Sequence, residues 1–131
     1  MNMNVLIVEN QAPLGEIWCE HISRMGAAAT LKKTQDVAIE ALRSVKFDVL
    51  ILDLNLGDGG AMAVADYASY RQPEIKVIFV TSDSFFSDGS IFSYMANACA
   101  MVPTRTPPED LAALVEHHGR SPAPPMRRVP A

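Results

Sequence analysis

Residues 48–60 read DVLILDLNLGDGG. Four apolar residues, Val49 to Leu52, lead directly into one carboxylate, Asp53, and a polar, glycine-rich loop follows. A short apolar run that ends in turn residues is typical of a buried strand. Open α/β sheets place their chemistry at the carboxyl ends of such strands. Asp53 is therefore the first candidate for a functional residue.

Apolar runs of this kind recur along the chain and alternate with helical patterns. Strands are predicted at residues 5–8, 27–31, 47–52, 75–80 and 99–102. Helices are predicted at 12–25, from 34 or 36 to about 44 with Val37, Ala41 and Val45 facing inward, at 61–70, weakly at 84–98, and from 107 onward. Five alternations predict an α/β fold, a doubly wound five-stranded parallel sheet with helices on both faces. The uninterrupted apolar runs also favour a sheet that is covered on both sides.

Composition favours one soluble domain. The chain has 131 residues, of which 49% are hydrophobic, and its net charge of -4 argues against nucleic-acid binding. We expect a domain at residues 1–118 and a disordered, proline-rich tail at 119–131. No apolar run is long enough for a signal peptide or a membrane span, so we expect a cytoplasmic protein with no membrane partner. Cys19 and Cys99 are interpreted as reduced thiols, with a disulfide as the alternative.

Three predicted strands end in polar residues: Glu9 and Asn10, then Asp53, then Thr81 and Ser82. In a parallel sheet these ends emerge at one edge. Two neighbouring carboxylates repel each other, and Mg²⁺ would relieve that repulsion while bridging to phosphate. A hydroxyl on the next strand could hydrogen-bond a phosphoryl oxygen. The pattern predicts phosphoryl transfer onto a carboxylate, with Asp53 as the nucleophile.

Four segments in order resemble the receiver domain of response regulators, in particular the chemotaxis-type single-domain proteins. They are residues 5–10 (VLIVEN), 50–56 (LILDLNL), 77–82 (VIFVTS) and 108–111 (PEDL), and the resemblance covers about residues 4 to 118. It implies the flavodoxin-like receiver fold.

The resemblance also implies roles and partners. Asp53 would accept a phosphoryl group from a histidine kinase or a phosphotransfer protein. Mg²⁺ would be held by Asp53, by the backbone carbonyl of Asn55 and by one of Glu9 or Asn10. Thr81 would be the switch hydroxyl. The protein would then be no enzyme beyond self-catalysed phosphorylation and dephosphorylation, and it would act on a downstream protein target or form a homodimer.

The chain departs from the family at several positions, including Gly57 where a proline is usual in the loop after Asp53. Asn10 stands where the family usually has a second acid, which predicts weaker Mg²⁺ binding. Thr104 stands at the position of the usual lysine, a fixed cation that pairs with the aspartate and then with the phosphoryl oxygens. Arg105 is next to it, but a shift of one residue turns a side chain to the other face. Met101 replaces the switch aromatic residue.

Docking surfaces are carried over from the family. A kinase would contact the first helix near Leu14, Ile17 and Trp18, together with the loop at residues 106–107. Trp18 could equally belong to the core. Output or dimerisation would use the fourth helix, the fifth strand and the last helix.

Three functional hypotheses stay open. The first is a stand-alone phosphorylatable receiver, because few residues follow the last predicted helix. The second is a pseudo-receiver, an interaction module that is independent of phosphorylation, as Thr104, Asn10 and Met101 suggest. The third is a small hydrolase of the haloacid dehalogenase type, but that chemistry needs an aspartate where this chain has Asn55.

Overall fold

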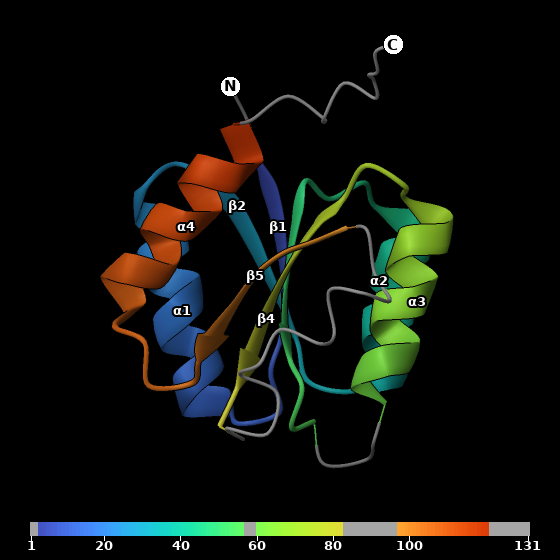
Figure 1. Ribbon diagram of the computed structural model, residues 1–131, viewed down its shortest axis with the longest axis horizontal. Helices are drawn as coiled ribbons and strands as arrows, with labels where there is room; N and C mark the ends of the chain where they lie inside the picture. Colours follow the sequence, from blue (N-terminus) through green and yellow to red (C-terminus); the bar gives the residue numbers. More distant parts are fainter. Residues whose placement is uncertain (1–2, 57–59, 83–96, 121–131) are drawn as a thin grey trace, which may run out of the picture.

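The computed structural model describes residues 3–56, 60–82 and 97–120. The elements follow one another as β1 (Asn4–Val8), α1 (Ala12–Arg24), β2 (Ala28–Lys32), α2 (Gln35–Ser44), β3 (Val49–Asp53), α3 (Ala61–Arg71), β4 (Lys76–Thr81), β5 (Ala98–Pro103) and α4 (Pro108–Arg120) (Figure 1). The helix predicted at 84–98 and the tail predicted at 119–131 lie largely outside the described residues, and residues 119–120 belong to α4. None of the described helices is both long and apolar enough to cross a membrane.

The five strands of the described residues form one parallel sheet in the order β2-β1-β3-β4-β5. This is the flavodoxin-like strand order, with its switch point between β1 and β3. Helices α1 and α4 cover one face, and α2 and α3 cover the other (Figure 1). The predicted fold class, a doubly wound five-stranded parallel sheet, is therefore confirmed.

The core consists of two apolar layers, one on each face of the sheet. Strands β1 and β3 send alternate side chains into both layers, so residues 5–8 and 49–52 are all buried. Such strands need apolar residues at every position, which explains their uninterrupted runs. The two strands are neighbours in register, from Val5 opposite Val49 to Val8 opposite Leu52. The residues that follow them therefore emerge side by side.

Local signals at the helix ends agree with the sequence. Gly26 follows α1 with a φ of 100°, a left-handed conformation that favours glycine. The side chain of Thr34 accepts a hydrogen bond from the backbone N–H of Val37 at 3.5 Å, so Thr34 is the N-cap of α2.

The predicted inward face of α2 is wrong at Val37 and Val45, whereas the third predicted residue, Ala41, is partly buried against the core. Val37 and Val45 are 45% and 46% exposed, whereas Ala38 and Leu42 are buried. Residues 37 and 41 and residues 38 and 42 have the same helical spacing, so periodicity alone could not choose between the two rows. Val45 has an extended backbone at the C-cap, where helical spacing no longer applies.

Candidate functional site

Three polar side chains lie buried at the carboxyl edge of the sheet. Glu9 follows β1 and is 0% exposed, Asp53 ends β3 and is 4% exposed, and Thr81 ends β4 and is 6% exposed. They are the only charged or polar side chains that are buried in the described part of the chain. Burial of a polar group is costly unless it is satisfied, so a cluster of three at one edge indicates a functional site. The sheet brings together the residues that the sequence predicted.

Glu9 lies next to Asp53, and its environment disfavours the ionised form of its carboxyl group. One carboxyl oxygen, Oε2, accepts a hydrogen bond from the backbone N–H of Gln11 at 3.0 Å, whereas Oε1 has no partner among the described residues. Burial raises the pKa of Glu9 to about 8, and a hydrogen bond and charge repulsion from Asp53 add to the effect of burial. The raised pKa favours the protonated form of Glu9 in the metal-free protein.

Asn55 links the Asp53 carboxylate to the end of β4. Its backbone N–H donates to Asp53 Oδ1 at 2.8 Å. Its side-chain oxygen, Oδ1, accepts from the Thr81 hydroxyl at 3.3 Å, from the Ser82 backbone N–H at 3.0 Å and from the Ser82 hydroxyl at 3.2 Å. The sequence placed Ser82 at this edge without a role and indicated only the carbonyl of Asn55, so it missed the contact between these two side chains.

Asn10 ties the loop after β1 to the loop after β3. Its side-chain Nδ2 donates to the backbone carbonyl of Leu56 at 3.0 Å. The side chain is otherwise exposed beside Glu9. Because Nδ2 faces Leu56, the amide oxygen of Asn10 is the atom left to ligate a cation. This hydrogen bond between Asn10 and Leu56 could not be predicted from the sequence pattern.

The fifth strand brings no cation to this edge in the described residues. The backbone N–H of Thr104 donates to the backbone carbonyl of Thr81 at 3.0 Å, so Thr104 lies beside Thr81. Arg105 is exposed and forms no ion pair with the described acids. Met101 is half-buried against the layer under α2 and α3.

Trp18 belongs to the core. It is 1% exposed and lies in the layer under α1 and α4, so it cannot be a docking contact. Ile17 is 42% exposed, and Leu14 is partly buried. The predicted docking face of α1 therefore reduces to these two side chains.

The donor atoms at this edge fit Mg²⁺. Two carboxylates and a backbone carbonyl are hard oxygen ligands, and the unpartnered Glu9 Oε1 needs a positive partner once the group is ionised. The described residues contain no group of three acids, histidines or cysteines that could hold a metal. Any Mg²⁺ here would therefore rest on few protein ligands and keep several waters, as Mg²⁺ prefers.

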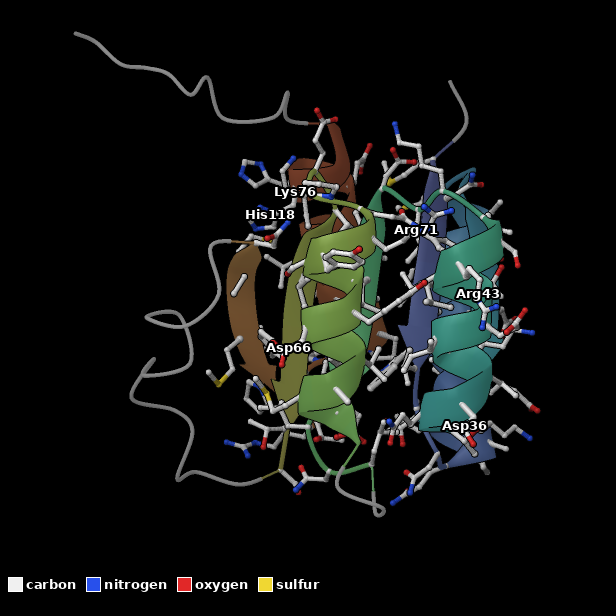
Figure 2. The ribbon with its side chains drawn as sticks, turned by 90° about the vertical axis from the view of Figure 1, so that its right-hand side faces the viewer. Asp36, Arg43, Asp66, Arg71, Lys76 and His118 are labelled. Atoms are coloured by element: carbon white, nitrogen blue, oxygen red, sulfur yellow. The ribbon has the colours of Figure 1, made fainter. Side chains whose placement is uncertain are left out.

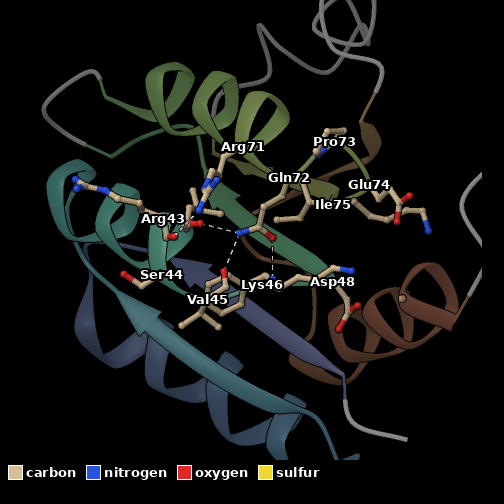
Figure 3. A pocket seen from close by; sticks show the side chains of 14 residues that line it. Arg43, Ser44, Val45, Lys46, Asp48, Arg71, Gln72, Pro73, Glu74 and Ile75 are labelled. Atoms are coloured by element: carbon tan, nitrogen blue, oxygen red, sulfur yellow. Dashed lines mark hydrogen bonds between the residues drawn. The ribbon is translucent and has the colours of Figure 1, made fainter.

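An open pocket lies at the other end of the sheet. It has a volume of about 570 Å³ and is lined by the ends of α2 and α3 and by the segments that enter β3 and β4 (Figure 3). Gln72 crosses it: its Oε1 accepts from the Phe47 N–H at 2.8 Å, and its Nε2 donates to the carbonyls of Leu42 and Val45 at 2.8 and 2.7 Å. Arg43 and Arg71 lie at the same end of the molecule (Figure 2). The pocket is remote from Asp53 and takes no part in the candidate site.

Solved structures with the same architecture are receiver domains of response regulators. The non-phosphorylated HemR receiver domain from Leptospira biflexa matches with a TM-score of 0.82 and 21% identity over 93% of this chain and 98% of its own. A CheY-like receiver domain protein from Methanospirillum hungatei matches with a TM-score of 0.81 and 20% identity, over 91% and 94%. The fold is the receiver fold.

A third structure with the receiver fold was solved with a metal. It is the response regulator TrrA from Thermotoga maritima in complex with Mg²⁺-BeF, with a TM-score of 0.75 and 18% identity over 88% of this chain and 97% of its own. The sequence matches no protein-family model and no curated protein. The structural likeness therefore reaches well beyond the similarity of the sequences.

Proposed function

We propose that this protein is a response-regulator receiver that accepts a phosphoryl group on Asp53 and signals by protein–protein contact. The observation that carries the proposal is the position of Asp53. Its buried carboxylate ends β3, lies against Glu9, and shares an edge with Thr81. A reactive carboxylate beside a second acid and a hydroxyl donor suits phosphoryl transfer.

The chemistry is a displacement at phosphorus. An Asp53 carboxylate oxygen attacks the phosphorus atom and forms a P–O bond, while the bond from phosphorus to the leaving group breaks. With a phosphohistidine donor the P–N bond breaks and the imidazole leaves. With acetyl phosphate the P–O bond breaks and acetate leaves. Hydrolysis of the acyl phosphate later returns the carboxylate and inorganic phosphate.

Different residues of this edge would bind Mg²⁺ and the phosphoryl group. Asp53, the Asn55 carbonyl and Glu9 or Asn10 would hold Mg²⁺, which neutralises the charge of the transferring group when it is bound. Thr81 would donate its hydroxyl proton to a phosphoryl oxygen. Glu9 must lose its proton before it can ligate the metal, because only the ionised carboxylate binds well.

The partners would be a histidine kinase or phosphotransfer protein and a downstream protein. The exposed Ile17 and the half-buried Leu14 give the amino end of α1 an apolar rim suited to the donor protein. Strand β5 and helix α4 would carry the output or a homodimer. Beyond its own phosphorylation and dephosphorylation, the chain would have no enzymatic role.

Intact mass after incubation with acetyl phosphate and Mg²⁺ tests the proposal. We expect one added phosphoryl group on the wild type, none on Asp53→Ala, and an unchanged gain on Asp66→Asn, which alters an exposed aspartate of α3 (Figure 2). No gain on the wild type with acetyl phosphate or a kinase donor, or an equal gain on Asp53→Ala, would contradict it.

A pseudo-receiver is the second candidate, favoured by Thr104 at the lysine position. Without a fixed cation from β5, the edge loses a direct link between phosphorylation and the fifth strand. In that case partner binding would be indifferent to Mg²⁺ and to Asp53→Asn. Loss of binding in Asp53→Asn would exclude this candidate.

A further inference from the structure

The side chain of Asn55 makes three contacts with the end of β4 that the proposed chemistry does not use. Its Oδ1 accepts from the Thr81 hydroxyl, the Ser82 N–H and the Ser82 hydroxyl, at 3.3, 3.0 and 3.2 Å. The donors belong to Thr81, which ends the strand next to β3, and to Ser82, which follows it. The same residue donates from its backbone N–H to the Asp53 carboxylate at 2.8 Å. Asn55 thus contacts the phosphoacceptor with one group and the switch hydroxyl with another.

Donor and acceptor roles fix the orientation of the amide. The Ser82 backbone N–H can only donate, so the atom of Asn55 that faces it must be the oxygen. The Thr81 hydroxyl faces that same oxygen and must therefore donate its proton to it. The orientation rests on a backbone group and does not depend on a choice between nitrogen and oxygen.

The contact with Thr81 is the weakest of the three. An amide oxygen has two lone pairs, so three donors compete for it. The Thr81 contact is the longest, at 3.3 Å, and lies beyond the usual range for O–H···O hydrogen bonds. The Ser82 donors therefore hold the amide in place, and the contact between the Thr81 hydroxyl and Asn55 Oδ1 is the easiest of the three to break.

We infer that Asn55 is a positioning residue whose side-chain oxygen competes with a phosphoryl group on Asp53 for the hydrogen bond that the Thr81 hydroxyl donates. This rests on the proposed function. A threonine hydroxyl has one proton, so it cannot donate to Asn55 and to a phosphoryl oxygen at once. The hydrogen bond to Asn55 and the hydrogen bond to the phosphoryl group therefore exclude each other. Loss of the bond to Asn55 reduces the free energy that is gained when Thr81 binds the phosphoryl oxygen.

Two variants of Asn55 distinguish the role of its side chain from the role of its backbone groups. Asn55→Leu has a similar shape and keeps the backbone groups, but it cannot accept a hydrogen bond. Asn55→Asp keeps an acceptor oxygen. In the metal-free protein, NMR should show the Ser82 amide exchanging at least about threefold faster in Asn55→Leu and at nearly the wild-type rate in Asn55→Asp. Asn55→Ala replaces the leucine variant if the latter does not fold.

Titration with beryllofluoride in saturating Mg²⁺ tests the competition for Thr81. We expect Asn55→Leu to bind this phosphoryl mimic about threefold more tightly than the wild type, the factor of a weak hydrogen bond. In a Thr81→Ala background the same substitution should leave the affinity nearly unchanged, because the competing hydroxyl is gone.

The outcomes are distinct. Tightening of equal size in the Thr81→Ala background, weaker binding by Asn55→Leu, or unchanged exchange at Ser82 would each overturn the inference. A wild type that binds no beryllofluoride would instead contradict the proposed function. Exchange at Ser82 would then still decide whether Asn55 holds the end of β4.

Discussion

Glu9 and Asp53 lie side by side at the carboxyl ends of two neighbouring strands, and Asp53 adds to the effect of burial on the pKa of Glu9. Burial is the larger cause of the raised pKa of Glu9, about 8 against an ordinary 4.5, and Asp53 adds to it. Between these two pH values the folded protein holds a proton that the unfolded chain has released. The contribution of Glu9 to stability is thus complete below pH 4.5 and is lost as the pH rises through 8.

Mg²⁺ affinity should therefore rise with pH. Because the metal must displace the Glu9 proton, we expect the affinity to increase about tenfold per pH unit below 8 and to level off above it. Isothermal titration at several pH values measures this. Glu9→Gln, which has no proton to lose, should bind Mg²⁺ weakly with a flat profile between pH 6 and 8. A wild-type profile as flat as that of the variant would contradict the protonated state of Glu9.

Asn10→Asp should remove the hydrogen bond to Leu56 and add a negative charge next to Glu9. A carboxylate cannot donate to the Leu56 carbonyl as the amide now does at 3.0 Å, so the metal-free protein should lose about 1 kcal/mol of stability. The added charge should raise Mg²⁺ affinity about tenfold. Asn10→Ala is the control, because it loses the contact and gains no charge. Urea denaturation measures the stability of both variants, and titration measures their Mg²⁺ affinity. A loss of Mg²⁺ affinity in Asn10→Asp would contradict the prediction.

Thr104→Lys should restore a cation beside the carboxylates. Thr104 is hydrogen-bonded to Thr81 through its backbone, so an ammonium there would come close to Asp53 and Glu9. We expect tighter beryllofluoride binding and a pH profile of Mg²⁺ binding that moves to lower pH, since a cation lowers the pKa of Glu9. Ala113→Lys adds the same charge at an exposed position of α4 and should change neither. An equal effect of the two lysines would mean that only net charge matters.

Leu42→Ala and Val37→Ala compare the two rows of α2. Leu42 is 1% exposed in the core, so its truncation should cost about 2–5 kcal/mol. Val37 is 45% exposed, and its truncation should stay within about 0.5 kcal/mol. Chemical denaturation gives both values, and similar losses would favour the face that the sequence pattern predicted.

Gln72→Met should loosen the far end of the sheet and leave the site intact. The variant keeps the shape of glutamine and loses hydrogen bonds to Phe47, Leu42 and Val45, which together should cost about 3 kcal/mol. Glu74→Gln alters an exposed neighbour in the same pocket and should cost less than about 0.5 kcal/mol. Thermal unfolding measures both. Beryllofluoride affinity should be unchanged, because the pocket is remote from Asp53.

The sheet and the main site residues could be predicted because each depends on a local pattern. Uninterrupted apolar runs mark strands that are covered on both faces, and the first polar residue after each run marks the carboxyl edge. Parallel connections then bring Glu9, Asp53 and Thr81 together without further information.

The rest depends on contacts that no local pattern encodes. Asn55 and Ser82 are 27 residues apart, and only the register of β3 against β4 makes their side chains meet. The tie between Asn10 and Leu56 spans 46 residues in the same way. For Trp18, helical spacing allowed either the core or the surface, and packing against α4 and the sheet decided for the core.

The central position of β1 has a consequence for synthesis. Strand β1 is made first but lies between β2 and β3, so one of its edges stays unpaired until residues 49–53 have left the ribosome. Its four residues from Val5 to Val8 are all fully buried in the finished protein. An apolar strand with an open edge is a template for aggregation. Until β3 emerges, the nascent chain therefore exposes an apolar strand edge that favours aggregation.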